Sequence, residues 1–428
     1  MIQRVKVLAQ SRFVRNVAIV ATGTAGAQAI SMAFTPIITR LYGPEAFGML
    51  GTFMAILGVL TPIAALTYPI AIVLPKSDAD AKSLAKFSAV LALVISAITT
   101  VVLLVAGGWI AEALSLGAIA GLLLLIPIAM VFSAYQQILT QWLIRKKQFK
   151  ITASVAVIQA LTINCAKAGV GWFHPVGAVL IVIATIGQAI HAALLWSSIQ
   201  GRETAHPNQD ESTGTLGELA KRHRDFPIYR APQVALNALS QSLPILMLAS
   251  FFGPAAAGFY TLGRMVMGVP SALIGNSVSN VFYPRITEAA HSGENLLKLL
   301  MRATTAMAAV GVVPFGVVVA FGPWLFSFVF GTEWVVAGEY ARWLALWMYF
   351  GFLNRPSVAA IATLGLQDFF LLYEIVSVAL RAIAIYIGFV VFKDDVLAVA
   401  LFSLIGVLLN ASLVIFTLKK SKRMPASE

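Results

Sequence analysis

The sequence predicts an all-α polytopic membrane protein, with about twelve transmembrane helices arranged as two six-helix lobes around a central cavity. Three observations predict this fold: the composition, the length of the apolar runs and the distribution of basic residues. Of the 428 residues, 59% are hydrophobic and 11% are charged, whereas a soluble protein is about 45–50% apolar and about 25% charged. The composition excludes a soluble globular enzyme, a disordered chain and a disulfide scaffold.

Twelve apolar runs are each long enough to cross about 30 Å of hydrocarbon as a helix. We expect spans at residues 15–39, 46–74, 87–107, 118–144, 152–172, 176–199, 231–252, 257–283, 298–321, 339–362, 370–392 and 397–418. The boundary between the last two spans is the weakest, because only Lys393, Asp394 and Asp395 separate the two helices. Prolines fall inside several spans; they mark either functional bends or ordinary breaks that membrane helices tolerate.

Basic residues decide the orientation. If both termini are cytoplasmic, the cytoplasmic segments hold 23 Lys and Arg residues, and the opposite side holds only Arg40 and Lys393. This bias is typical of cytoplasmic loops, and it accounts for most of the net charge of +12 without any nucleic-acid partner. We expect a six-helix lobe at residues 1–200, a cytoplasmic linker loop at 201–230 and a second six-helix lobe at 231–428.

A short motif repeats in the two halves. The first copy reads YGPEAFG at residues 42–48, and the second reads FGPAAAG at residues 252–258, with an offset of 210 residues. Each copy lies on the external turn between the first and second spans of its half. In such a turn Gly ends one helix and Pro starts the next, and the second Gly permits close packing. Two parallel repeats of this kind occur in transporters that bind substrate near the membrane midplane.

Polar side chains recur on single faces of several spans. Their spacing of three or four residues places each set on one side of a helix. Either these stripes line a wet central cavity or they form ordinary hydrogen bonds between helices; taken together, we favour the cavity. The stripes are Thr24, Gln28, Ser31 and Thr35 in the first span, Gln233, Asn237 and Gln241 in the seventh, and Asn276, Asn280 and Tyr283 in the eighth.

Five basic residues fall within the expected spans, where each costs at least about 2.5–3.5 kcal/mol. They are Lys167, Arg264, Arg342, Arg355 and Arg381. Glu339 and Arg342 are three residues apart and we expect them to pair, and Glu374 shares a helix face with Arg381. The remaining cations either line a substrate cavity or form structural ion pairs and snorkel. A cavity with more cations than acids favours an anionic ligand, because Arg forms bidentate hydrogen bonds with phosphate.

The sequence contains no signature of catalysis or of a cofactor. It has no GxxxxGK[ST], HExxH or GxSxG motif, its five histidines are scattered, and Cys165 is its only cysteine. Asp394 and Asp395 could hold a metal, but a tight external turn explains them better. We therefore expect a protein that is not an enzyme, with no catalytic residues, no cofactor and no metal.

Several segments resemble bacterial lipid-linked oligosaccharide flippases of the O-antigen type, which belong to the multidrug/oligosaccharidyl-lipid/polysaccharide (MOP) exporter superfamily. These segments are TRLYGPEAFG at 39–48, GFYTLGR at 258–264, the continuation from Val269-Pro270 to Pro284-Arg285, and FGTEW at 330–334. The resemblance implies two six-helix lobes, a cationic cavity and an undecaprenyl-diphosphate-linked oligosaccharide as cargo. Arg40 and Arg264 match the family pattern directly, whereas Arg355 and Arg381 follow from their burial.

The resulting hypothesis is a flippase of the bacterial inner membrane that moves oligosaccharide repeat units outward for O-antigen, capsule or exopolysaccharide synthesis. Its substrate-binding residues would be Arg40, Arg264, Arg355, Arg381, Gln28, Asn237, Gln241 and Asn280. Glu374 would couple transport to a proton or sodium ion, although the first span lacks the acid found in many proton-coupled drug exporters. We expect a monomer with both termini cytoplasmic, in contact with membrane lipids and with polymerase and chain-length machinery. A multidrug/toxin antiporter and a membrane enzyme of glycan assembly remain as alternatives.

Overall fold

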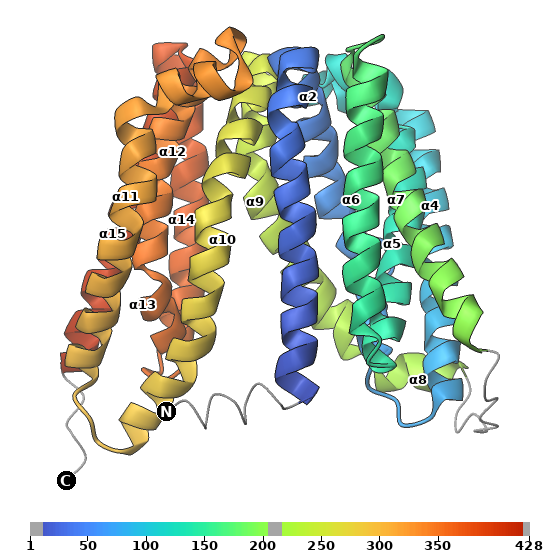
Figure 1. Cartoon of the computed structure of the whole chain (residues 1–428), viewed down its shortest axis with the longest axis horizontal. Helices are drawn as coiled ribbons and strands as arrows, with labels where there is room; N and C mark the ends of the chain where they lie inside the picture. The colour runs from blue at the N-terminus through green and yellow to red at the C-terminus, as the bar shows by residue number, and fades with distance from the viewer. Residues whose placement is uncertain (1–11, 204–215, 423–428) are drawn as a thin grey trace. The chain divides into compact units, whose positions relative to one another are not determined.

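The computed structural model describes residues 12–203 and 216–422, and these residues form helices and turns without a β-strand. The all-α class predicted from the sequence is confirmed (Figure 1). The α-helices are α2 (Arg12–Ala64), α3 (Tyr68–Ala71), α4 (Asp78–Ala113), α5 (Leu125–Arg145), α6 (Phe149–Gly171), α7 (Gly177–Glu203), α8 (Leu216–Arg222), α9 (Ala231–Phe252), α10 (Pro254–His291), α11 (Leu296–Phe330), α12 (Val335–Leu353), α13 (Arg355–Ala360), α14 (Gln367–Ile387) and α15 (Asp395–Lys422). Short 3-10 or π turns are η1 (Gly117–Leu122), η2 (Phe226–Arg230), η3 (Thr332–Trp334) and η4 (Gly388–Phe392).

Among the described residues, eight helices are long and apolar enough to cross a membrane. Helix α2 is counted once, although it contains the first and second expected spans on either side of a bend at Gly43. Helices α5 and α10 and the pair α12–α13 occupy three further expected spans. Each of the twelve apolar runs therefore contains helix, and the chain is a polytopic membrane protein.

Two expected spans end or break earlier than their hydropathy suggests. The run at 46–74 leaves the helix at Ala64, because Leu66 and Thr67 take left-handed backbone angles before α3 starts. The run at 339–362 is divided into α12 and α13 at Asn354. Pro356 explains this second break, since proline lacks the N–H group that would continue the helical ladder.

The chain forms two compact units. One contains Met1–Tyr42 and Met49–Leu246, and the other contains Gly43–Gly48 and Met247–Glu428. The expected linker at 201–230 includes α8 and η2, while residues 204–215 of that linker lie outside the described residues.

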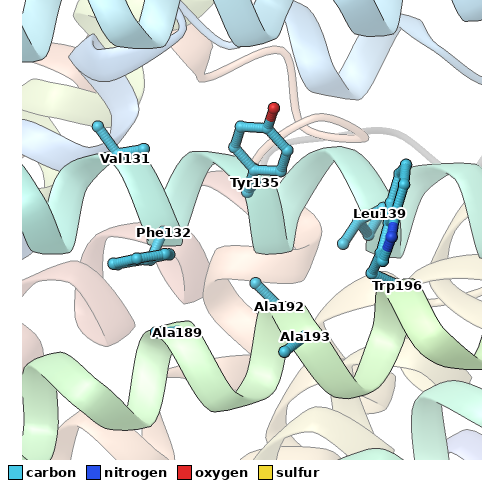
Figure 2. A pocket seen from close by; sticks show the side chains of 8 residues that line it. All are labelled: Val131, Phe132, Tyr135, Leu139, Ala189, Ala192, Ala193 and Trp196. Carbon is cyan, nitrogen blue, oxygen red and sulfur yellow. The ribbon is translucent and has the colours of Figure 1, made fainter.

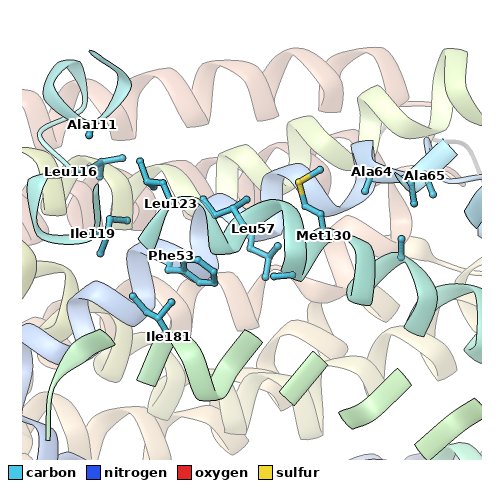
Figure 3. Close-up of a cluster of buried hydrophobic side chains, with 14 residues drawn as sticks. Phe53, Leu57, Ala64, Ala65, Ala111, Leu116, Ile119, Leu123, Met130 and Ile181 are labelled. Carbon is cyan, nitrogen blue, oxygen red and sulfur yellow. The ribbon is translucent and has the colours of Figure 1, made fainter. Parts of the chain in front are cut away.

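In the first unit, α5 packs against α4 and α7, and α6 packs against α7 (Figure 1). One apolar cluster joins the second half of α2 to η1, α5 and α7 around the fully buried Phe53 and Met130 (Figure 3). A second cluster surrounds Trp142 and Leu143 and connects α3, α4, α5 and α7. Because lipid is as apolar as these side chains, their association depends on close packing rather than on removal from water.

In the second unit, α12 is the central helix, because it packs against α10, α11 and α15. Small residues allow one of these contacts to be very close. A Cβ atom on Gly338 of α12 would lie 2.6 Å from the carbonyl oxygen of Gly322 of α11. The expected pair between Glu339 and Arg342 is confirmed, with 3.2 Å between Oε2 and Nη1. Arg342 also donates a hydrogen bond from Nε to the carbonyl of Val319 at 2.9 Å.

The two copies of the repeated motif have the same backbone conformation and contact each other within the second unit. Gly43 (φ 68°, ψ 174°) and Gly253 (φ 89°, ψ 177°) both take positive φ angles that favour glycine, each immediately before a proline. A Cβ atom on Gly48 would lie 1.6 Å from the carbonyl oxygen of Pro254. Reciprocally, a Cβ atom on Gly258 would lie 2.0 Å from the carbonyl oxygen of Pro44. The second glycine of each motif thus permits close packing, as predicted, and its partner is the other copy.

Candidate functional site

Two arginines of the second unit lie near the same buried tyrosine. Helix α10 places Tyr260 and Arg264 four residues apart, and therefore on one helix face. Helix α14 contributes Arg381, and Tyr260 interacts electrostatically with both guanidinium groups. Arg264 also acts on Arg381, so the two positive charges share one neighbourhood. This neighbourhood, formed by Tyr260, Arg264 and Arg381, is called the arginine site below.

Aromatic rings from two other helices contact the guanidinium group of Arg381. Its guanidinium carbon lies 5.4 Å from the ring centre of Trp347 and 5.7 Å from that of Phe402. The two rings meet edge to face, with 5.0 Å between their centres. Nε of Arg381 donates a hydrogen bond to the carbonyl of Ser377 at 3.0 Å. Cation–π contacts of this kind contribute about 0.5–2 kcal/mol each, which offsets part of the cost of a charge at this depth.

A buried hydroxyl group beside Arg381 has no hydrogen-bond partner among the described residues. It is Oη of Tyr260, on a residue that is only 1% exposed. Buried polar groups are nearly always paired, and exceptions often indicate a missing water, ion or ligand. The arginine site therefore has both positive charge and unused hydrogen-bonding capacity.

The acid expected beside Arg381 does not neutralise it by direct contact. Glu374 interacts electrostatically with Arg381, and its residue is exposed. Within the described part of the chain, no ion pair of 4 Å or less joins the two side chains. Arg381 instead uses an aromatic pair and a backbone carbonyl.

Arg355 lies apart from these contacts in the described structure. It begins α13, directly after the break at Asn354, and is half-buried. Nδ2 of Asn354 donates to Oδ1 of Asn410 at 3.0 Å, which links this break to α15. The electrostatic partners of Arg381 are Tyr260, Arg264, Tyr373 and Glu374, and Arg355 is not one of them.

The other expected binding residues belong to the first unit or lie outside the description. Gln28 and Arg40 are exposed on α2, and Asn237 and Gln241 are exposed on α9. Asn280 lies in α10, but its side chain is outside the described residues. The role of each as a binding residue remains a prediction.

Part of the polar stripe on the first span serves helix packing. Nδ2 of Asn164 on α6 donates to Oγ of Ser31 at 3.2 Å, and Oγ1 of Thr35 donates to the carbonyl of Ser31 at 2.7 Å. Interhelical hydrogen bonding, the alternative to cavity lining, accounts for Ser31. Gln28 lies on the same stripe but is exposed, so this explanation does not extend to it.

Sequence reasoning found the arginines but not the groups that hold them. Tyr260 could have been found, because it precedes Arg264 by four residues. Trp347 and Phe402 are distant from Arg381 in sequence, and no local pattern connects them to it. Over residues 12–203 and 216–422, no group of three or more His, Cys, Asp or Glu side chains could hold a metal ion.

A family model described as "Polysaccharide biosynthesis protein" matches residues 37–339. Among curated protein sequences, none matches the chain. Solved structures share the fold at low sequence identity. An inward-facing multidrug resistance transporter of the MATE family, in the MOP superfamily, is 13% identical with a TM-score of 0.72, covering 93% of this chain and 96% of its own. The lipid II flippase MurJ, in an inward closed conformation, is 13% identical with a TM-score of 0.68, covering 94% of this chain and 87% of its own.

A third similar structure is a MOP superfamily transporter from Pyrococcus furiosus, which is 12% identical. Its TM-score is 0.59, and the match covers 96% of each chain. It is described as having a binding pocket of reverse polarity that suggests a different function. At these identities the three likenesses show the fold alone.

Proposed function

The chain belongs to the family of polysaccharide biosynthesis proteins and has the fold of MOP superfamily transporters, and from this premise we propose that it is a lipid-linked oligosaccharide flippase. Its cargo would be an oligosaccharide repeat unit on undecaprenyl diphosphate. It would carry this cargo from the cytoplasmic to the outer leaflet of the bacterial inner membrane, for assembly of O-antigen, capsule or exopolysaccharide.

One observation carries the proposal: Arg264 and Arg381 share the neighbourhood of Tyr260 without an acid in direct contact with Arg381 among the described ion pairs. Guanidinium groups bind phosphate oxygens through charge-assisted, often bidentate hydrogen bonds. The unpartnered hydroxyl of Tyr260 adds hydrogen-bonding capacity for the same headgroup. A cationic drug would be repelled by this site. Pocket polarity has also been used to argue for a different function in the P. furiosus transporter.

The cargo joins a polar oligosaccharide to an apolar lipid, and the two parts have different requirements for crossing the membrane. Each sugar hydroxyl that enters hydrocarbon unpaired costs about 2–7 kcal/mol, so polar side chains must replace water for the glycan. The lipid tail stays in the bilayer throughout. Alternating access would expose the diphosphate first to the cytoplasmic side and then to the outside. A cytoplasm-negative potential favours outward movement of an anion by about 2.3 kcal/mol per charge per 100 mV.

Coupling and partners complete the proposal. Glu374 is the candidate for proton or sodium coupling, because it is the acid that interacts electrostatically with Arg381. The protein would act as a monomer and deliver its product to polymerase and chain-length machinery.

The test replaces each arginine of the site by glutamine, as Arg264→Gln and Arg381→Gln. Arg342→Gln is the matched control, because Arg342 lies in the same unit and pairs with Glu339. Surface glycan is measured in a strain that depends on the plasmid-borne gene, with membrane levels of each variant quantified. We expect both site variants to lose surface glycan at normal membrane levels while the control keeps it. Full surface glycan in Arg264→Gln or Arg381→Gln at a normal membrane level would refute the proposal.

A further inference from the structure

An apolar groove separates the facing sides of α5 and α7 in the first unit, and nothing described so far uses it. Its volume is about 420 Å³, within the range of about 300–1,000 Å³ that is usual for ligand sites. It is lined by Val131, Phe132, Tyr135 and Leu139 of α5 and by Ala189, Ala192, Ala193 and Trp196 of α7 (Figure 2).

The two walls of the groove differ in shape. On α7 three alanines form a floor of small side chains, because Ala189, Ala192 and Ala193 follow one another on a single helix face. On α5 the ring of Phe132 points toward α7, whereas the ring of Tyr135 points away from it, and Trp196 of α7 lies beside Leu139 (Figure 2). The groove therefore combines small alanine side chains with larger aromatic ones.

The groove opens on an apolar surface at a defined depth. Tyr135 is 37% exposed and Trp196 is 49% exposed, and the same two helices carry other exposed apolar side chains such as Ile128 and Ile186. The lining begins six residues before Arg145, the end of α5, which corresponds to about 9 Å, and extends to about 21 Å. This is the depth of lipid chains in the leaflet next to that end of the helix.

Positive charge lies just beyond the shallow end of the groove. Trp142 follows Leu139 by three residues, and the ammonium groups of Lys82 and Lys146 lie 5.7 Å and 5.3 Å from its ring centre. Asp78 pairs with Lys146 and, at 2.9 Å, with Arg145. The two segments that meet here, residues 76–86 and 145–150, contain seven basic residues and two acidic ones. An amphipathic ligand with its chain in the groove would therefore have an anionic headgroup.

We propose that the α5–α7 groove binds the polyprenyl chain of the transported lipid at the end of the helices that carries Arg145. The assignment rests on the proposed function and adds a tail site to it, in the unit that does not contain the arginine site. The polyprenyl chain moves from the apolar bilayer into an apolar groove of the protein, so burial from water contributes nothing to binding. Affinity comes instead from close packing and from a limited loss of conformational freedom.

A polyprenyl chain fits these requirements better than a straight acyl chain. Each isoprene unit contains a planar double bond that cannot rotate, so fewer torsions are frozen per carbon on binding. Its flat alkene faces pack against Phe132, Tyr135 and Trp196, and its methyl branches fit above the alanine floor. A straight acyl chain has no branches for that floor and loses more rotational freedom.

The test uses geranylgeranyl monophosphate with a diazirine at the far end of its chain, added to the full-length protein in phosphatidylcholine nanodiscs. Peptides labelled after photolysis are mapped by mass spectrometry. We expect labels on 131–139 and 189–196, and competition by unlabelled geranylgeranyl monophosphate but not by an equal concentration of dioleoyl phosphatidylglycerol. Equal competition by the straight-chain lipid, or labels elsewhere, would overturn the assignment.

Filling the groove provides the matched variant. Ala193→Phe places a ring in the slot from an exposed position, and Ala97→Phe places the same ring on an exposed apolar face of α4 in the same unit. We expect Ala193→Phe to weaken probe binding about tenfold, which corresponds to about 1.4 kcal/mol, and to raise the substrate concentration needed for half-maximal transport. Ala97→Phe should change neither. Unchanged labelling or unchanged transport in Ala193→Phe overturns the assignment.

The two proposals fail in different ways. If the probe labels the groove of the parent protein but this protein transports no lipid-linked glycan, the proposed function alone is refuted. Transport that depends on Arg264 and Arg381 but is indifferent to Ala193→Phe would refute the groove alone.

Discussion

Replacing Gly48 by alanine tests whether the contact between the two repeated motifs stabilises the second unit. The added methyl group would lie 1.6 Å from the carbonyl oxygen of Pro254, whereas an ordinary contact begins near 3.4 Å. The oxygen belongs to the backbone, and a Cβ atom has no side-chain torsion by which to move away, so the segments must separate by the difference, about 1.8 Å. We therefore expect Gly48→Ala to destabilise the protein although alanine is the better helix former.

The magnitude follows from the contacts that this separation disturbs. Phe47 precedes Gly48 and meets Trp334 edge to face, with 5.2 Å between ring centres, and Phe259 meets the same indole at 6.1 Å. Each such pair is worth about 0.5–1.5 kcal/mol. Inserting a methylene into a well-packed region costs about 1–3 kcal/mol. Because the two estimates describe overlapping contacts, we expect a loss of about 2–3 kcal/mol.

The assay is thermal unfolding of the purified protein in detergent, with Gly316→Ala as the control. Gly316 lies within α11, and no described atom lies within 4 Å of its added methyl group. The control should unfold at the parental temperature or slightly above it. The reciprocal variant Gly258→Ala should also destabilise, but the double variant should lose less than the sum, because the first substitution has already separated the segments. Parental stability of Gly48→Ala, or strict additivity of the pair, would refute the reasoning.

Three further predictions use other contacts. Arg145→Lys should lower the free energy of unfolding by about 2–3 kcal/mol in a denaturation assay. Arg145 donates hydrogen bonds to Asp78 and to four backbone carbonyls at residues 72–76, and lysine lacks the planar guanidinium group that makes them. An unchanged free energy would contradict this role. Glu339→Gln should change the same quantity by less than about 1 kcal/mol, since the side chains of Arg342 and Glu339 are 43% and 36% exposed, and a larger loss would show that the pair matters more than its exposure suggests. Burial, together with the positive charge of the neighbouring Arg222, lowers the pKa of His223 below its usual 6.5. The neutral His223 side chain therefore contributes stability above the unfolded-state pKa, and this stability is lost as pH falls through the folded-state pKa. Acidification should therefore raise hydrogen exchange at residues 216–230, corrected for the intrinsic rate, and His223→Gln should abolish this response; the same response in the variant would exclude His223 as its cause.

Several properties of this protein follow from the sequence because they depend on neighbouring residues. An apolar run of about twenty residues forms a helix in a membrane whatever it packs against, since its backbone groups must be paired internally. The motif at 42–48 similarly fixes a local conformation, because positive φ angles favour glycine and the following proline starts a helix. The break at Asn354 was open to prediction from Pro356, but many membrane helices continue through proline.

Other properties required the tertiary structure, because they join residues that no local pattern relates. Arg381 was recognisable as a buried cation, but its aromatic partners Trp347 and Phe402 come from two other helices. The α5–α7 groove exists only because packing brings three alanines of one helix beside aromatic residues of another. The repeated glycines predicted a close contact between helices, but only the tertiary structure showed that the second glycine of each motif contacts the other copy of the motif. Local chemistry determines which segments are helices, whereas side-chain packing between helices determines which residues meet.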